Sequence, residues 1–221
     1  MRATAELAIL LMLMTSRRAG EGERELRDNR WAGWRPTYLV GQGLQDKLLG
    51  LIGFGRIAQE TARIAEQAFG MRIAYHSRRP LSPESPLAGR WTYHPSIDTL
   101  LAEADFVSLH CPGGTETFHL IDEARLRIMK PSAILINTAR GSIIDEAALA
   151  QALIDGAIAG AGLDVYEHEP HVNPALIALQ NVVVLPHLGS ATSETRVAMG
   201  MRAADNLDHF FDGKTPPDQV A

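Results

Sequence analysis

Short apolar runs alternate with amphipathic segments along most of the chain. The runs predict strands at residues 48–54, 71–76, 91–93, 106–109, 133–136, 160–165 and 182–185. The segments between and after them have helical spacing and predict helices at residues 56–69, 97–102, 123–129, 145–154 and 193–211. Strands that are apolar throughout and separated by helices are typical of a parallel sheet buried on both faces. The pattern therefore predicts an α/β fold, a doubly wound parallel sheet with helices on both faces.

The N-terminal region has a different pattern. Residues 4–14 are apolar nearly all round, so a helix there must be covered on most sides. Residues 16–30 are strongly charged, and Trp31 and Trp34 follow them. An apolar helix, a solvated arm and exposed tryptophans together favour a subunit interface. Packing of the helix against its own domain is the alternative.

A glycine motif stands between the strand at 48–54 and the helix at 56–69. The motif is Gly-x-Gly-x-x-Ala and begins at Gly53. In a strand–turn–helix context, Gly53 permits the sharp turn, Gly55 lets backbone amides approach a pyrophosphate, and Ala58 allows close packing of helix on strand. The positive end of the helix dipole then faces the phosphates. The motif predicts a Rossmann-like dinucleotide site with contacts from Gly53, Phe54, Gly55, Arg56 and Ile57.

The loop after the strand at 71–76 bears on the choice of dinucleotide. An acidic residue about 20 positions past the glycines binds the 2′-hydroxyl of NAD, but this chain has Ser77-Arg78-Arg79 there. Ser77 carries no charge to repel a 2′-phosphate, and either arginine can bind one bidentately. The loop favours NADP over NAD. A solvated pair of surface arginines is the alternative interpretation.

Polar side chains follow three other strands of the predicted sheet. Arg140 comes after the strand at 133–136, Asp164 and Glu169 come after residues 160–163, and His187 comes after the last strand. Because parallel strands end at one edge of the sheet, Arg140, Glu169 and His187 can converge on one cleft. Singly, each has a structural alternative as a helix-end, surface or loop residue.

Composition and charge limit the remaining possibilities. The chain has 221 residues, of which 46% are hydrophobic, and its net charge of −5 argues against a nucleic-acid partner. Its single cysteine, Cys111, excludes an internal disulfide and fits a reducing, cytoplasmic compartment. The apolar stretch at 7–14 is too short to span a membrane. One cysteine and scattered histidines, of which His168 and His171 are the only close pair, make a metal site unexpected.

Several stretches resemble the D-isomer-specific 2-hydroxyacid dehydrogenases. They are Leu51–Ala58, Leu109–Pro112, Ile136–Gly141, Gly162–Val165, Glu169-Pro170 and Pro186-His187. The Ser77-Arg78-Arg79 loop is similar to that of NADP-using glyoxylate and hydroxypyruvate reductases. The resemblance implies hydride transfer between NADP, or less readily NAD, and a small 2-oxo or 2-hydroxy acid.

Site roles follow from the same resemblance. It implies that Arg140 grips the substrate carboxylate and carbonyl, that His187 is the acid/base and that Glu169 orients it. Asp164 resembles the aspartate near the nicotinamide amide. Further cofactor contacts are implied at Cys111, Pro112, Thr117, Thr138, Ala139, Arg140, His187 and Gly189. The chemistry is consistent, because an imidazole exchanges a proton near neutral pH and a neighbouring carboxylate favours its protonated form.

Two departures from the family pattern qualify the expectation. Residues 112–117 read Pro-Gly-Gly-Thr-Glu-Thr, which predicts a more mobile loop near the phosphates. The start of the chain resembles the helix that enters the coenzyme domain, which implies that most of the substrate domain is absent. The expected organisation is residues 1–46 as an N-terminal helix and dimerisation arm, 47–192 as the dinucleotide-binding domain, and 193–221 as a C-terminal helix and tail.

Two alternatives to an active reductase remain open. One is a catalytically silent dinucleotide-binding module that acts in dimerisation or sensing. The other is a fragment of a phosphoglycerate dehydrogenase, which the Ser77-Arg78-Arg79 loop disfavours because that enzyme uses NAD. In each case the expected assembly is a homodimer.

Overall fold

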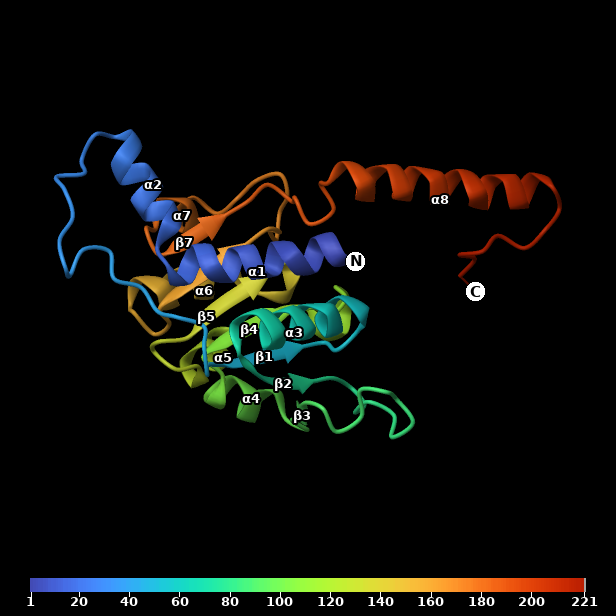
Figure 1. Cartoon of the computed structure of the whole chain (residues 1–221), viewed down its shortest axis with the longest axis horizontal. Coiled ribbons are helices and arrows are strands. Elements are labelled where there is room, and N and C mark those ends of the chain that lie inside the picture. The colour runs from blue at the N-terminus through green and yellow to red at the C-terminus, as the bar shows by residue number, and fades with distance from the viewer. Residues whose placement is uncertain (221) are drawn as a thin grey trace.

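The structure, a computed structural model, describes residues 1–220. A parallel sheet of seven strands forms its centre (Figure 1). The strands are β1 (Leu48–Ile52), β2 (Arg72–His76), β3 (Thr92–Tyr93), β4 (Phe106–Leu109), β5 (Ile134–Asn137), β6 (Gly160–Leu163) and β7 (Val182–Val184). Their order is β3-β2-β1-β4-β5-β6-β7, and every neighbouring pair is parallel. The predicted doubly wound sheet is confirmed.

The strand order reverses between β1 and β4. From β1 the chain moves outward to β2 and β3, and then it returns to the other side of β1 to begin β4. In open α/β sheets ligands bind beyond the carboxyl ends of the strands at such a reversal. The topology therefore predicts a ligand site beyond the carboxyl ends of β1 and β4.

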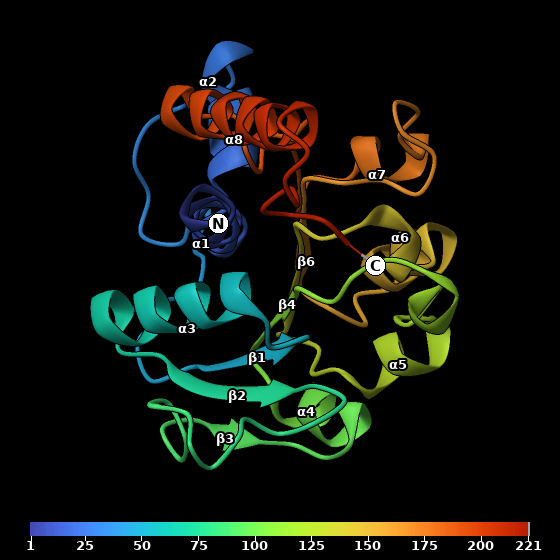
Figure 2. The same ribbon diagram turned by 90° about the vertical axis from the view of Figure 1, so that its right-hand side faces the viewer.

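Helices cover both faces of the sheet, as Figure 2 shows. One face is covered by α1 (Arg2–Ser16) and α3 (Arg56–Phe69), whose buried side chains share a hydrophobic cluster with the strands. The other face is covered by α4 (Ile97–Glu103), α5 (Glu123–Ile128), α6 (Glu146–Ile154) and α7 (Pro174–Ala178). Two cores, one on each side of the sheet, result from strands that are apolar on both faces.

Element boundaries differ from the predictions in small ways. The strand predicted at 48–54 ends at Ile52, because Gly53 has a positive φ of 83° and starts the turn into α3. The helix α7 was not predicted. It has only five residues, and it begins where the side chain of Asn173 caps the helix and Pro174 occupies the first turn. The charged arm contains a helix, α2 (Ala19–Arg27), in which no residue is buried.

The helix α1 packs inside its own domain. Ala5, Ala8, Leu11 and Met12 have no exposed surface, and α1 lies over β5, β6 and β7 beside α3. A Cβ atom at Gly162 of β6 would lie 2.9 Å from Cβ of Leu11, so glycine permits this close approach. Packing against its own domain, one of the two alternatives for this helix, therefore accounts for the buried face of α1. The dimerisation role of residues 1–46 stays a prediction.

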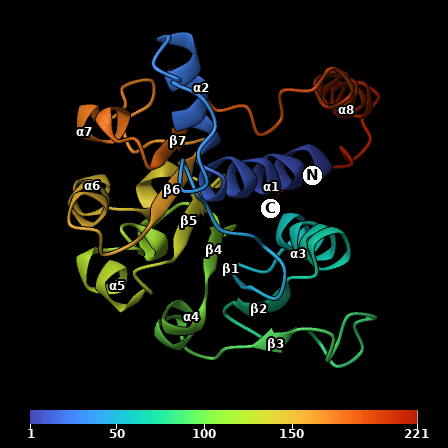
Figure 3. The same ribbon diagram turned by 60° about the vertical axis from the view of Figure 1, so that its left-hand side comes forward.

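The last helix stands apart from the sheet. In Figures 1 and 3, α8 (Ser193–Phe211) extends away from the body formed by the other elements. No residue within Ser193–Phe211 is buried. Its exposed large apolar side chains are Val197, Met199, Met201, Leu207, Phe210 and Phe211. Contacts with the C-terminal tail, such as that of Arg202 with Asp218, leave these apolar side chains exposed, so α8 presents an apolar surface that is uncovered here.

None of the helices in residues 1–220 is long and apolar enough to cross a membrane.

Candidate functional site

An open cleft of about 810 Å³ lies at the carboxyl ends of the central strands. Most of its lining comes from the loops after β4, β5, β6 and β7. The lining residues are Thr4, Ile57, His110, Cys111, Pro112, Gly113, Gly114, Thr138, Ala139, Arg140, Ser142, Asp164, His187, Gly189 and Ser190. Ile57, Cys111, Pro112, Thr138, Ala139, Arg140, Asp164, His187 and Gly189 are residues that the sequence singled out. The cleft lies where the reversal of strand order places a ligand site.

The two motif glycines meet different requirements. Gly53 has a left-handed backbone, and a Cβ atom there would lie 2.5 Å from the backbone nitrogen of Cys111. Gly55 is the N-cap of α3, with open space where its Cβ would be, and no side chain within residues 1–220 caps the helix. The first amides of α3 are therefore available to an anion. Arg56 is exposed beside them.

Phe54 is placed differently from the other motif residues. Its side chain is buried, and its ring stacks on Tyr75 with 3.9 Å between ring centroids. Trp91 meets the same ring edge-on. The side chain of Phe54 therefore belongs to the core, and only its backbone is left for the predicted cofactor contact.

The loop after β2 lies outside the lining of the cleft. The Ser77 hydroxyl donates to the carbonyl oxygen of Arg79 at 2.6 Å, which tightens the turn. Arg78 and Arg79 are exposed. The guanidinium of Arg78 lies 3.7 Å from the carboxylate of Glu116 in the loop after β4. The two loops therefore approach each other on either side of β1.

His187 and Glu169 form a hydrogen-bonded pair. Nδ1 of His187 lies 2.8 Å from Oε2 of Glu169, and the amide of Tyr166 donates to Oε1 at 3.0 Å. Burial by itself raises the pKa of Glu169, but the hydrogen bonds from His187 and Tyr166 and the charges of His187 and Arg140 bring that pKa below its ordinary value. Glu169 is therefore ionised near neutral pH and can orient the imidazole.

Arg140 is held at the cleft by its own loop. The buried side chain of Asn137 donates to the carbonyl oxygen of Arg140 at 2.9 Å and accepts from the amide of Ala139 at 3.0 Å. The guanidinium donates to the Ala139 carbonyl at 2.6 Å. A Cβ atom at Gly113 would lie 3.0 Å from Cγ of Arg140, so this loop also leaves room for the arginine.

Asp164 fixes the backbone around His187. Its fully buried carboxylate accepts from the amides of Leu188 at 2.7 Å and Gly189 at 2.8 Å. Burial raises its pKa, against the effect of these two hydrogen bonds. The Asp164 carbonyl accepts from the amide of His187, whose positive φ of 55° is unusual for a residue other than glycine. Asp164 thus positions the loop of His187, and the predicted role near the nicotinamide amide stays a prediction.

Thr138 and Thr117 differ in what their hydroxyls do. The buried Oγ1 of Thr138, at the cleft, has no hydrogen-bond partner among residues 1–220. Oγ1 of Thr117 instead donates to the Pro112 carbonyl at 2.7 Å and closes its own loop. An unpartnered hydroxyl, open helix amides and a guanidinium along one cleft fit a ligand that carries phosphates and polar ring substituents. The residues therefore fit a dinucleotide.

The neutral groups beside the cleft limit its acid–base chemistry. Burial lowers the pKa of His110 to about 4, and its Nε2 lies 2.9 Å from the Ser108 hydroxyl. Burial raises the pKa of the Cys111 thiol to about 11. Both groups are neutral near pH 7, so among the groups at the cleft His187 stays the predicted proton donor.

Some site residues gave no signal in the sequence. The Thr4 hydroxyl at the start of α1 donates to the Gly189 carbonyl at 2.9 Å, across 185 positions. The buried carboxylate of Glu146 accepts from the amide of Glu167 at 2.7 Å and so anchors the loop that carries Glu169. Burial raises the pKa of Glu146. Only the folded chain brings these residues together.

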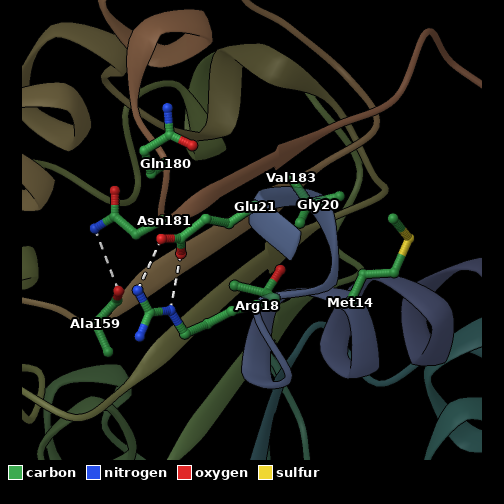
Figure 4. Close-up of a pocket in the computed structure, with 9 residues that line it drawn as sticks. Met14, Arg18, Gly20, Glu21, Ala159, Gln180, Asn181 and Val183 are labelled. Carbon is green, nitrogen blue, oxygen red and sulfur yellow. Dashed lines mark hydrogen bonds and ion pairs between the residues drawn. The ribbon is translucent and has the colours of Figure 1, made fainter. Parts of the chain in front are cut away.

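A second cavity, of about 290 Å³, lies away from the predicted site (Figure 4). Arg18 and Glu21, which line it, pair with each other at 2.8 Å, and Asn181 donates to the Ala159 carbonyl at 3.2 Å. None of the predicted site residues lines it. Within residues 1–220, no three His, Cys, Asp or Glu side chains gather as a metal site would require.

Comparison with known families and sequences gives a consistent result. Residues 9–189 match the model of the D-isomer specific 2-hydroxyacid dehydrogenase NAD binding domain. A glyoxylate reductase of Thermococcus litoralis is 47% identical over 223 residues, which cover 99% of this chain and 66% of the relative. A glyoxylate reductase of Aeropyrum pernix is 46% identical with the same coverage. The chain thus spans about two-thirds of the length of these relatives.

Two solved structures superpose closely on this chain. A protein of Thermus thermophilus superposes with a TM-score of 0.92 at 45% identity, covering 100% of this chain and 68% of that one. An NADPH-dependent glyoxylate/hydroxypyruvate reductase of Sinorhizobium meliloti, in complex with NADP and malonate, has a TM-score of 0.86 at 41% identity. That match covers 95% of this chain and 64% of the reductase.

Proposed function

The chain belongs to the D-isomer-specific 2-hydroxyacid dehydrogenase family, and from this premise we propose that it is the coenzyme-binding and catalytic part of an oxidoreductase. The proposed reaction is reduction of a small 2-oxo acid, of glyoxylate or hydroxypyruvate type, with NADPH. The observation that carries the proposal is the 2.8 Å contact of His187 with Glu169 at the cleft that Arg140 also lines.

Each residue of the cleft has a separate role in the proposed reaction. A bound nicotinamide cofactor supplies the hydride. Arg140 provides a fixed cation that can bind the substrate carboxylate and polarise the adjacent carbonyl. His187, with Nδ1 engaged by Glu169, has Nε2 left to donate a proton to the carbonyl oxygen. The ionised Glu169 orients the imidazole through Nδ1, and Asp164 holds the backbone of His187 in place.

The residues at the β1–α3 turn support dinucleotide binding. The uncapped start of α3 offers backbone amides to a pyrophosphate, and Gly55 leaves space for its approach. Thr138 offers a buried hydroxyl that still needs a partner. These groups hold the cofactor in the proposed complex.

The choice of NADP rests on the loop after β2. Ser77 brings no negative charge, and Arg78 and Arg79 are exposed beside it. The S. meliloti relative is NADPH-dependent and has been solved with NADP. We propose that this chain shares the preference.

The test combines binding and turnover on the same preparation. NADPH and NADH are titrated by nicotinamide fluorescence, and oxidation of NADPH is then followed with glyoxylate and with hydroxypyruvate. We expect tighter binding of NADPH than of NADH and turnover of at least one of the two acids. Absence of NADPH binding would contradict the proposed function.

A silent dinucleotide-binding module is the second candidate. The chain spans 66% of the length of its relatives, and the apolar surface of α8 is uncovered. A cleft that is open to water gives weaker electrostatic assistance to the reaction. Binding of NADPH without turnover of either acid would favour this candidate.

We also propose a homodimer that uses the arm, in a protein of the cytoplasm. Trp31 and Trp34 are 53% and 80% exposed, and Leu26 and Val40 on the same arm are exposed as well. Sedimentation velocity of the wild type and of a Trp31→Ser/Trp34→Ser variant tests the dimer. We expect a dimer for the former and a monomer for the latter.

A further inference from the structure

Arg78 and Glu116 face each other from the two loops that flank the β1–α3 turn. Arg78 follows β2 and Glu116 lies in the 3-10 turn Thr115–Thr117 that follows β4. In the sheet, β2 and β4 are the two neighbours of β1. Nη1 of Arg78 lies 3.7 Å from Oε2 of Glu116, and both side chains are more than four-fifths exposed. The pair therefore spans the glycine turn from side to side.

We propose that Glu116 is a specificity-determining residue that opposes the binding of a 2′-phosphorylated dinucleotide, by competing for Arg78. The inference rests on the proposed function, because it concerns the cofactor of that site. It adds a residue that sequence reasoning did not include among the cofactor contacts. Glu116 moderates the preference for NADPH that the two arginines create.

Hydrogen bonds within its loop keep Glu116 near Arg78. The Thr117 hydroxyl donates to the Pro112 carbonyl at 2.7 Å, and the Thr117 amide donates to the Gly114 carbonyl at 3.1 Å. These bonds close a short turn around Glu116. The backbone of Glu116 is thus fixed, while its carboxylate stays exposed and within reach of the guanidinium.

The two dinucleotides make different demands on this pair. NADH carries a 2′-hydroxyl, so the ion pair between Arg78 and Glu116 can remain when it binds. NADPH carries a 2′-phosphate, which needs the guanidinium and is repelled by a carboxylate close to it. Because the pair is exposed and screened by water, the effect on affinity is modest.

The experiment measures dissociation constants rather than turnover. NADPH and NADH are titrated by nicotinamide fluorescence against the wild type, Glu116→Gln, Arg78→Ala and the double variant. For Glu116→Gln we expect NADPH to bind roughly twofold to fivefold more tightly, in the range of an exposed ion pair. NADH should bind as it does to the wild type. In the Arg78→Ala background, substitution of Glu116 should change NADPH affinity much less.

A matched control accounts for the change in net charge. Glu123 lies on α5, is exposed and pairs with Arg127, so Glu123→Gln removes the same charge from an ion pair that lies outside both the cleft and the arm. We expect no change of NADPH affinity in this control. Added salt should reduce the difference between wild type and Glu116→Gln.

Other results would overturn the inference. An unchanged or weaker affinity of Glu116→Gln for NADPH would do so. An equal gain in its affinity for NADH would also do so, as would the same gain in NADPH affinity when Glu116 is substituted in the Arg78→Ala background. If the wild type binds neither dinucleotide, the proposed function fails and the inference fails with it. If the wild type binds NADPH and the variants behave alike, only the inference fails.

Discussion

Nδ1 of His187 lies 2.8 Å from Oε2 of Glu169, although 18 positions separate the two residues. The ionised carboxylate accepts the Nδ1 proton, so the protein selects which imidazole nitrogen remains for the cleft. The second carboxylate oxygen is held by the amide of Tyr166, which keeps Glu169 in place. The geometry thus joins the proposed proton donor, His187, to the carboxylate proposed to orient it.

The first prediction concerns the proton donor. His187→Gln should lower the rate of glyoxylate reduction roughly 100-fold to 10,000-fold, because general acid catalysis contributes that much. Affinity for NADPH should stay nearly unchanged, since the amides of α3 and the hydroxyl of Thr138 are untouched. Rates are followed by NADPH oxidation and affinity by fluorescence. An equal loss of both would show that His187 has a structural role.

The second prediction separates the two motif glycines. Gly55→Ala should fold normally, because its φ of −78° suits any residue and nothing lies within 4 Å of the added Cβ. It should weaken NADPH binding roughly 10-fold to 100-fold, since it obstructs hydrogen bonds from backbone amides to a charged phosphate. Equilibrium denaturation and fluorescence titration measure the two effects. Unaltered affinity would argue that the pyrophosphate does not sit at this turn.

Gly53→Ala should behave in the opposite way. Its φ of 83° is unfavourable for alanine, and the new Cβ would lie 2.5 Å from the Cys111 backbone nitrogen. We expect the free energy of unfolding to fall by about 1–3 kcal/mol or more. Stability equal to that of the wild type would contradict the packing described for this turn.

The third prediction concerns the buried carboxyl of Glu146. Glu146→Ala leaves the part-buried amide of Glu167 without its acceptor and should cost about 0.5–1.5 kcal/mol of stability. Glu146→Gln should cost less at neutral pH, because an amide oxygen still accepts from that N–H. Urea denaturation of the three proteins makes the comparison. Equal losses in Ala and Gln variants would argue against the hydrogen bond as the cause.

The same carboxyl has a defined pH signature. Burial raises the pKa of Glu146 above its ordinary value of 4.5. Its contribution to stability is therefore fully present below pH 4.5 and is lost as pH rises through the raised pKa. The stability of the wild type relative to Glu146→Gln should fall as pH increases across that interval. A difference that grows with pH in favour of the wild type would mean that the pKa is lowered instead.

The fourth prediction tests whether α1 belongs to the core. Leu11 has no exposed surface, so Leu11→Ala should lower the free energy of unfolding by about 2–5 kcal/mol. Leu10, one position earlier on the same helix, is 44% exposed and serves as the control. Leu10→Ala should stay within about 0.5 kcal/mol of the wild type. Similar losses in both variants would indicate that a second subunit covers the outer face.

Much of the fold could be predicted from local patterns. Apolar runs set the strands and helical spacing set the helices, because backbone hydrogen bonding and burial act within a few residues. The short helix α7 was missed since its five residues carry little periodic signal. The partner of α1 could not be predicted, because an apolar stripe does not specify what covers it.

The sequence by itself determined the sheet, the glycine turn and the polar residues at the strand ends, including Arg140, Glu169 and His187. Only the tertiary structure decided which of them meet, that Phe54 turns into the core, and that Asp164 holds the loop of His187. It also decided contacts such as Thr4 with Gly189. The reason is physical: strand and helix propensities act along the chain, whereas these contacts depend on how loops from distant strands pack at one edge of the sheet.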